Sequence, residues 1–220
     1  MPAIKLNEIE RRVLGTLIEK ALTTPQGYPL SLNSLMLGCN QKSARDPMME
    51  ATEQMIEEAC NKLKQRSLAI QFFPAGGRVP KWEEALTAVL NLNKEQSAII
   101  AELLLRGPQS EGELRQRASR MAPLDSLAKQ HEVLESLRTR PEPLVQRLSG
   151  EGRTRGVLWA HTFYPEGEEP ALPAASVRIA SPAASSTTGN STASVSPAGL
   201  EQRLAALEAR VAELERKTNS

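Results

Sequence analysis

The feature that most constrains this chain is an internal repeat, because the same succession of helix and hairpin signals occurs twice before residue 165. Asn7 opens the first copy and Asn93 opens the second. Glu10 and Gln96 follow three residues later, which is the pattern of a capping box at a helix N-terminus. Apolar residues then recur with the helical period of 3.6 in both copies. The chain is therefore expected to form two related units of roughly 80 residues each.

Each copy contains signals for three helices and then a hairpin. The apolar spacing predicts helices near 31–40 and 52–66 in the first copy, and the Ser-x-x-Glu box at 110–113 and the stretch 125–138 predict their counterparts. Short β-prone runs then flank Gly-rich turns at 74–77 and 149–152. Three helices and a hairpin make a winged helix. The predicted fold is mainly α with small β wings (α+β), as two tandem winged-helix domains over 1–91 and 92–164.

The composition narrows the class of protein. Aromatic residues are only 3 % of the chain, which favours aliphatic, helix-rich packing over a β-sandwich. The formal net charge is +1, so no strong field indicates nucleic acid or cations. Two cysteines without a CxxC pattern indicate a reducing compartment. No signal-peptide core or membrane span is recognisable, so a cytoplasmic location and no membrane partner are expected.

The sequence after the repeat predicts a linker and a dimerising helix. Residues 165–198 are dominated by Ala, Ser, Pro and Thr, which is typical of a disordered linker. An amphipathic heptad helix is predicted over 199–217, where the charges at the flanking positions favour a parallel homodimer. The alternative is a helix that folds back on its own chain. The predicted self-association residues are Leu200, Leu204, Leu207, Val211 and Leu214.

Several strings resemble the YceH family of bacterial proteins. They include TTP at 23–25, YPLSLN at 28–33, CNQKS at 39–43, RDP at 45–47 and LLLRGPQ at 103–109. The resemblance covers residues 6–164 and implies tandem winged helices, in agreement with the repeat. The family is largely uncharacterised, so the resemblance implies a fold rather than an activity. Ala44 departs from the family pattern, which usually has an asparagine there.

Two groups of residues are candidates for contact with DNA. The loop between the second and third helices of the first copy carries Asn40, Gln41, Lys42 and Arg45, and such side chains read adenine or bind guanine and phosphate. The alternative is structural, with Asn40 as a cap and Arg45 in an internal ion pair. The second group is basic and lies on the second copy and the two wings. Its members are Arg78, Lys81, Arg115, Arg117, Arg120, Arg153 and Arg155.

The charges of the third helices weaken the case for DNA. In the first copy this helix carries Glu53, Glu57 and Glu58 beside an equal number of basic residues. Carboxylates near phosphates repel, so weak non-specific affinity is expected. The basic side chains of the second group are equally consistent with plain solvated faces.

Catalytic chemistry has little support in the sequence. His131 and His161 are the only histidines, neither has a neighbouring cysteine, and no zinc-ligand spacing occurs. Cys39 and Cys60 are expected to be buried small hydrophobes. No catalytic residue, metal or cofactor is therefore predicted. The sequence favours a non-catalytic DNA-binding protein, a transcriptional regulator whose partner is double-stranded DNA. The alternative is a winged-helix scaffold whose partner is another protein.

Overall fold

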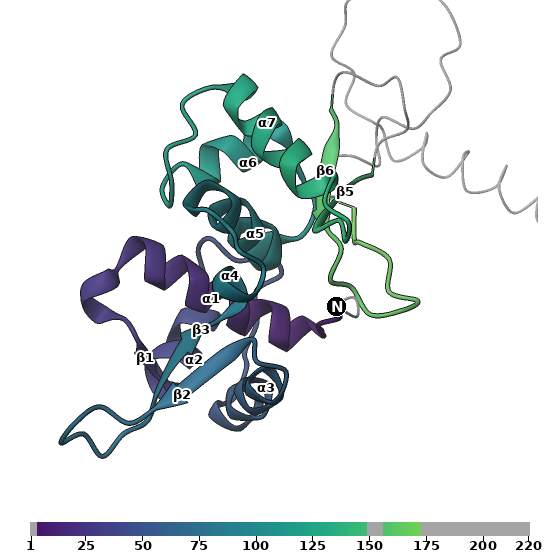
Figure 1. The fold of residues 1–220 in the computed structure, drawn as a ribbon. Coiled ribbons are helices and arrows are strands. Elements are labelled where there is room, and N and C mark those ends of the chain that lie inside the picture. The colour runs from purple at the N-terminus through teal and green to yellow at the C-terminus, as the bar shows by residue number, and fades with distance from the viewer. Residues whose placement is uncertain (1–3, 149–155, 173–220) are drawn as a thin grey trace, which may run out of the picture. The chain divides into compact units, whose positions relative to one another are not determined.

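The structure is a computed structural model that describes residues 4–148 and 156–172. It is a mixed α+β fold with two small antiparallel sheets (Figure 1). The first copy consists of α1 (Glu8–Thr23), the short 3₁₀ turn η1 (Pro25–Gly27), β1 (Leu30–Ser31), α2 (Leu32–Cys39), α3 (Glu53–Gln65), β2 (Ala69–Phe72) and β3 (Lys81–Glu84). After α4 (Leu86–Val89), the second copy consists of α5 (Lys94–Arg106), β4 (Gln109–Ser110), α6 (Glu111–Ala118), α7 (Leu127–Arg138), β5 (Val145–Arg147) and β6 (Leu158–His161).

The helices begin at the caps that the sequence indicates. Asn7 caps α1 and Asn93 caps α5, each in a complete capping box. Ser110 forms a third capping box at the start of α6. Each box satisfies backbone N–H groups that the first helical turn leaves without partners. These three predicted helix starts are confirmed.

The two sheets have the same strand order, with the last strand of each copy in the middle. The orders are β1-β3-β2 and β4-β6-β5. Leu30 of β1 lies opposite Trp82, and Gln109 of β4 lies opposite Trp159. Both tryptophans are buried. The antiparallel pairing of the two hairpin strands is confirmed in both copies, and the predicted turn at 149–152 lies outside the described residues. The two-residue strands β1 and β4 were not predicted, because two residues carry no periodic signal.

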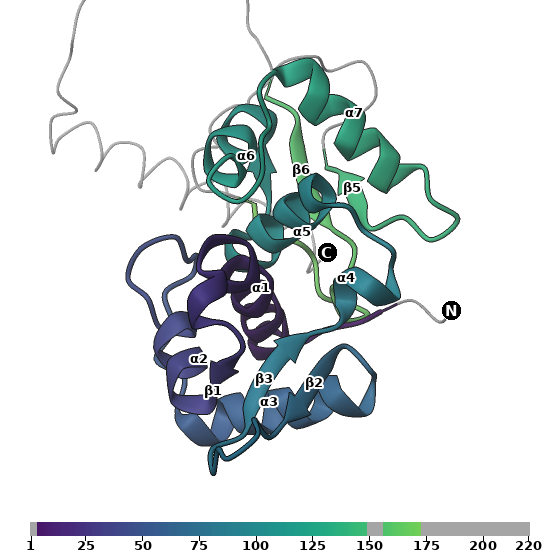
Figure 2. The ribbon, with the colours of Figure 1, turned by 60° about the vertical axis from the view of Figure 1, so that its left-hand side comes forward.

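One hydrophobic core runs through both copies. It includes residues from Leu6 to Phe163 and is built around α1 and α5, which pack against each other. In Figures 1 and 2, α3 and α7 lie on opposite sides of this helix pair. Gly15 permits the close packing, because a Cβ there would lie 3.0 Å from the Cβ of Leu104. The two copies are therefore joined by helix packing in addition to the chain between them.

Several predictions fall at or beyond the edge of the described residues. The start of the predicted linker lies against the first copy, where Glu168 forms an ion pair with Arg11. The rest of the linker, from residue 173, lies outside the described ranges, as do the heptad residues, Arg153 and Arg155. The predicted domain boundaries and the dimer stay predictions. Among the helices of residues 4–148 and 156–172, none is both long and apolar enough to span a membrane.

Candidate nucleic-acid interface

Asn40 holds the loop that joins α2 to α3. Its Nδ2 donates a hydrogen bond to the carbonyl oxygen of Ala51 at 2.8 Å, and its Oδ1 accepts one from the amide of Ala51 at 2.9 Å. The two bonds close the loop at the point where α3 is about to begin. Both polar groups of the Asn40 side chain therefore form hydrogen bonds within the protein. This agrees with a structural role for Asn40, which was the alternative to DNA contact.

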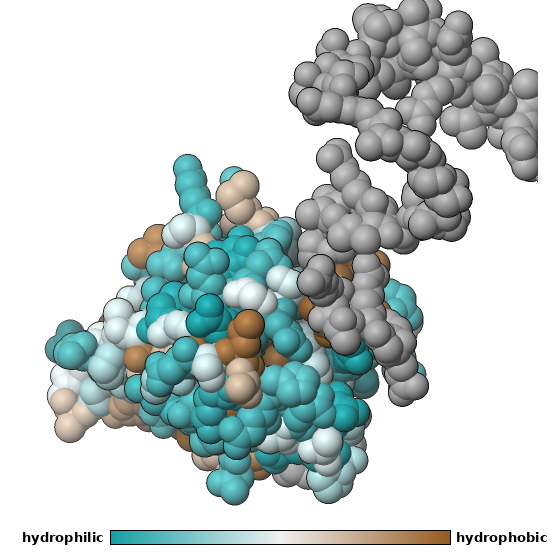
Figure 3. Space-filling model, turned by 90° about the horizontal axis from the view of Figure 1, so that it is seen from above, coloured by the Kyte–Doolittle hydropathy of each residue, from teal (hydrophilic) through white to brown (hydrophobic). Residues whose placement is uncertain are grey.

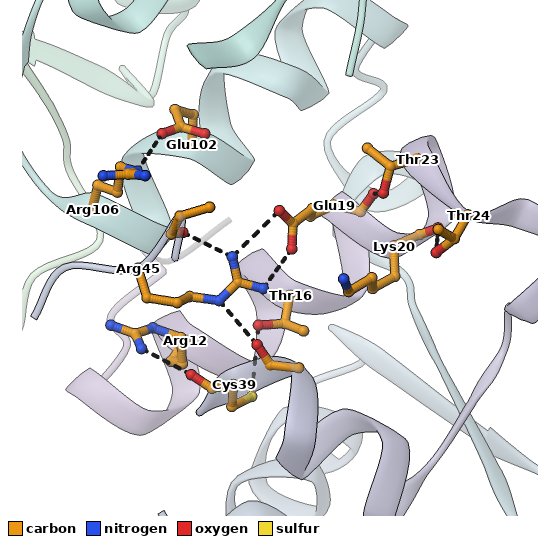
Figure 4. A network of polar contacts seen from close by, with 12 residues as sticks. Arg12, Thr16, Glu19, Lys20, Thr23, Thr24, Cys39, Arg45, Glu102 and Arg106 are labelled. Carbon is orange, nitrogen blue, oxygen red and sulfur yellow. Dashed lines mark hydrogen bonds and ion pairs between the residues drawn. The ribbon is translucent and has the colours of Figure 1, made fainter. Parts of the chain in front are cut away.

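Arg45 is buried inside the same loop rather than presented to solvent (Figure 4). Its Nε donates to the carbonyl oxygen of Gly38 at 3.0 Å, and its two terminal nitrogens contact both carboxylate oxygens of Glu19 on α1. Burial opposes the charge of Glu19, but the hydrogen bond and charge of Arg45 hold the pKa of Glu19 below its usual value. Arg45 therefore orders the loop from within.

Arg120 joins the two copies through carboxylates of both. It follows α6 and forms ion pairs with Glu19 of α1 and, at 3.2 Å, with Glu102 of α5. Glu102 also pairs with Arg106 at 3.0 Å. Burial raises the pKa of Glu102, and Arg120 and Arg106 oppose that rise. We call these five residues the ion cluster: Glu19, Arg45, Glu102, Arg106 and Arg120.

The other two basic candidates of α6 are also turned to neighbours or half-buried. Arg117 donates to Oε1 of Gln109 at 2.7 Å and pairs with Glu113 at 3.4 Å. The hydrogen bond from Ser110 and the charge of Arg117 lower the pKa of Glu113. Arg115 is half-buried, and within the described residues its buried Nε has no hydrogen-bond partner. Arg117 is therefore used within the second copy and Arg120 joins the two copies, while DNA contact by these residues stays a prediction.

The remaining candidates lie on the first copy. Lys42 and Arg78 are exposed, whereas Gln41 and Lys81 are half-buried. Lys81 belongs to β3, opposite Phe72. In the parts of the chain that the structure describes, neither Lys42 nor Arg78 has an ion-pair partner. These side chains keep their charge available to a ligand.

Lys64 is a further cation next to the hairpin that the candidate set did not include. It lies in the last turn of α3, and its Nζ donates to Oε1 of Gln71 on β2 at 2.8 Å. In the sequence, the acidic and basic residues of this helix are equal in number, so its net charge does not point to Lys64. The net charge does not show that Glu53 and Lys64 lie at opposite ends of α3. We call Lys64, Arg78 and Lys81 the hairpin cations.

The described residues offer no arrangement suited to metal binding or thiol chemistry. No group of three or more His, Cys, Asp or Glu in these ranges could hold a metal ion. Cys39 and Cys60 are buried and free. Burial raises the pKa of the Cys39 thiol to about 11 and also raises that of Cys60, so neither is a reactive thiolate near neutral pH.

Comparison with known proteins identifies relatives whose sequences match most of this chain. The family described as "Protein of unknown function, DUF480" matches residues 6–153. A "UPF0502 protein" of Geotalea daltonii is 49% identical over 160 residues, which is 73% of each chain. One of Geobacter sulfurreducens is 49% identical over 158 residues, or 72% of each. A third, of Azoarcus sp. (strain BH72), is 40% identical over 209 residues, or 95% of this chain and 89% of the relative.

Proposed function

The chain belongs to the DUF480 family together with these UPF0502 proteins, and on that premise we propose that it is a non-catalytic protein that binds double-stranded DNA and acts in transcriptional regulation. We take the YceH family, which the sequence strings resemble, to be the same family. In this proposal both copies are winged helices. The support is that helices, strand order and buried tryptophan recur in the two copies.

The observation that carries the proposal is the position of the hairpin cations. Arg78 is exposed in the β2–β3 hairpin, Lys81 lies on β3, and Lys64 reaches the hairpin from α3. A helix in the major groove with a basic hairpin beside it can neutralise backbone phosphates on either side of the groove. The hairpin cations would then position the first copy on the duplex.

Side chains on α3 supply groups that can read bases. Gln54, Asn61 and Gln65 are exposed on this helix. Asn and Gln form paired hydrogen bonds with adenine in the major groove. Three carboxylates at the N-terminal end and middle of the helix, Glu53, Glu57 and Glu58, are also exposed and repel phosphates. We therefore expect modest affinity that depends on few cations.

A protein-interaction scaffold remains the second candidate because the same hairpin carries apolar side chains. Phe73 is 65 % exposed, Val79 is 56 % exposed and Ile70 of β2 is 46 % exposed. Exposed apolar groups of this kind favour contact with another protein. The face shown in Figure 3 is, by contrast, mostly hydrophilic where it is not covered by grey atoms. A protein partner would therefore bind at the first-copy hairpin.

Binding to a duplex tests the proposal directly. Fluorescence anisotropy of a labelled mixed-sequence duplex of about 30 base pairs is measured with the full chain at 50 and 200 mM salt. We expect micromolar affinity at the lower salt and a loss of roughly tenfold or more at the higher, since phosphate contacts release counterions. No binding at 50 mM would overturn the proposal in favour of the scaffold.

Self-association is a separate part of the proposal and has its own test. The predicted heptad would pair two chains and raise avidity for a duplex. Light scattering should give the mass of a dimer for the natural chain and of a monomer for Leu207→Asp. An unchanged mass in the variant would show that the heptad does not hold a dimer.

A further inference from the structure

A cavity of about 620 Å³ lies between the two copies, and its lining includes three arginines and a histidine together with four carboxylates. It is bounded by the start of α1, the loop before α3, the end of α5 and the segment after β6. Its volume falls in the range of small-molecule sites. The side chains that matter are Arg11, Arg12, Arg106, His161 and Glu168.

Arg12 brings a buried charge that no carboxylate neutralises directly. The residue is only 2 % exposed, and its terminal nitrogens donate to the carbonyl oxygens of Cys39, at 3.0 Å, and Pro47. Among the described residues it has no ion-pair partner, and its Nε has no hydrogen-bond partner. A buried cation in this state is expensive unless an anion comes near it.

Arg106 adds a second cation at the other side of the cavity. Its Nε faces Glu102 at 3.0 Å within the ion cluster. Its two terminal nitrogens have no partner within residues 4–148 and 156–172. These nitrogens form the fork of donors that suits a carboxylate.

His161 supplies a neutral donor to the same cavity. The ring is 1 % exposed and stacks on Tyr164 with 4.0 Å between centroids. Burial, aided by the charge of Arg11, lowers the pKa of His161 to about 3. The Nδ1 atom accepts a hydrogen bond from the amide of Phe163 at 3.2 Å, so the proton resides on Nε2. In the described part of the chain this Nε2 has no partner.

The chain already places one of its own carboxylates in the cavity. Glu168 contacts Arg11 with both oxygens, at 3.2 and 2.5 Å, and Arg11 lies 4.8 Å from the centre of the Tyr164 ring. Glu168 itself is 40 % exposed. Since it lies in a surface segment without helix or strand, a competing anion can displace it at little cost.

We propose that this cavity binds a small organic ligand through a single carboxylate, which replaces Glu168 on Arg11 and accepts a hydrogen bond from His161. The class follows from the charges at the mouth. Glu8, Asp46 and Glu169 line the cavity and are exposed, so they repel a dianion such as phosphate more than a monocarboxylate. A cationic group elsewhere on the ligand would be attracted to them. The site does not depend on DNA binding.

Acetate is the smallest probe of this chemistry. The full chain, labelled with ¹⁵N, is titrated with sodium acetate against sodium chloride at matched ionic strength, and NMR shifts of the side-chain N–H groups of Arg106 and His161 are followed. We expect saturable shifts with acetate and none with chloride. Glu168→Gln should tighten acetate binding at least fivefold, because the internal competitor is gone.

Matched variants make the result specific. Glu166→Gln removes the same charge two residues away, at an exposed residue that does not line the cavity, and should leave acetate affinity unchanged. Arg11→Gln should weaken acetate binding at least fivefold, whereas Arg66→Gln should not, because it removes a cation that pairs with Glu10 and does not line the cavity. Equal affinities in the Glu168 and Glu166 variants, unsaturated shifts, or phosphate binding as tight as acetate would overturn the proposal.

Discussion

The two copies of the repeat use the same framework but employ their basic side chains differently. In the first copy the hairpin cations and Lys42 have no carboxylate partner within the described residues. In the second, Arg117 and Arg120 contact carboxylates of the fold, and on α7 Lys129 pairs with Glu132 and Arg138 with Glu135. Although the first copy pairs Arg45 with Glu19, it leaves these other cations without a carboxylate partner in the described ranges, whereas the second uses Arg117 and Arg120 to stabilise itself and its neighbour.

A repeat in the sequence therefore does not imply that both copies have the same function. Arg120 of the second copy binds Glu19 of the first, so the second copy fixes the helix on which the first is built. In the proposed function, the first copy is the DNA-binding unit and the second is its support. Substitutions in the two copies test this distinction.

The largest effect is expected from the ion cluster. Glu19→Gln leaves Arg45 and Arg120 without their shared counter-charge, and breaking a buried pair in this way costs about 3–5 kcal/mol. For a chain of this size the melting temperature should fall by roughly 6–20 °C. Calorimetry of the natural and variant chains measures the change.

Glu102→Gln is the matched substitution on the second copy and should cost clearly less. Burial already raises the pKa of Glu102, so its charge is less favoured in the folded state than that of Glu19. Because the pKa of Glu19 is lowered, its stabilisation is complete above its unfolded pKa and is lost as the pH falls through the folded one. An equal loss in both variants would contradict this account of the cluster.

The second prediction concerns the stability of the fold at low pH. The second copy should be the part that acid destabilises. His161 lies there and is kept neutral by burial, with its pKa lowered from 6.5 to about 3. Between those values the unfolded chain binds a proton that the folded chain does not, so stability rises with pH at up to about 1.4 kcal/mol per unit. Urea unfolding from pH 7 to 4 should show the slope, and His161→Phe should reduce it. An unchanged slope in the variant would exclude His161 as its source.

The smallest effect is expected from substituting two glycines, one where α1 packs against α5 and one outside that contact. Gly15→Ala places a Cβ 3.0 Å from the Cβ of Leu104 and 3.0 Å from the Cγ of Leu105. Overpacking of this kind costs typically about 1–3 kcal/mol, which exceeds the roughly 1 kcal/mol gained in helix propensity. Gly112 of α6 has open space, so Gly112→Ala should stabilise by about 0.5–1 kcal/mol. Unfolding in urea measures both, and stabilisation by Gly15→Ala would show that the joint is loosely packed.

Features that depend on residues close in sequence could be predicted. Features that depend on the packing of the two copies against each other could not. Capping boxes at Asn7 and Asn93 and the Gly-rich hairpin of the first copy involve neighbours within a few residues, and all were foreseen. The contact of α1 with α5 was not, because the same apolar stripe could cover its own copy. By their charge, Arg45 and Arg120 are candidates for DNA contact, with an internal ion pair as the alternative for Arg45, but the sequence does not show the distant Glu19 that binds them both.

Removing paired charges from each copy shows which copy contacts the duplex. Arg78→Gln with Lys81→Gln removes two hairpin cations, and Lys129→Gln with Arg138→Gln removes two cations that already have partners on α7. Duplex affinity is measured against salt concentration for each double variant and for the natural chain. We expect the hairpin variant to bind the duplex more weakly, with a slope of log affinity against log salt concentration that is smaller in magnitude by about 1.8. The affinity of the α7 variant should stay within about twofold of that of the natural chain. Weaker binding by the α7 variant with an unchanged hairpin variant would contradict this expectation.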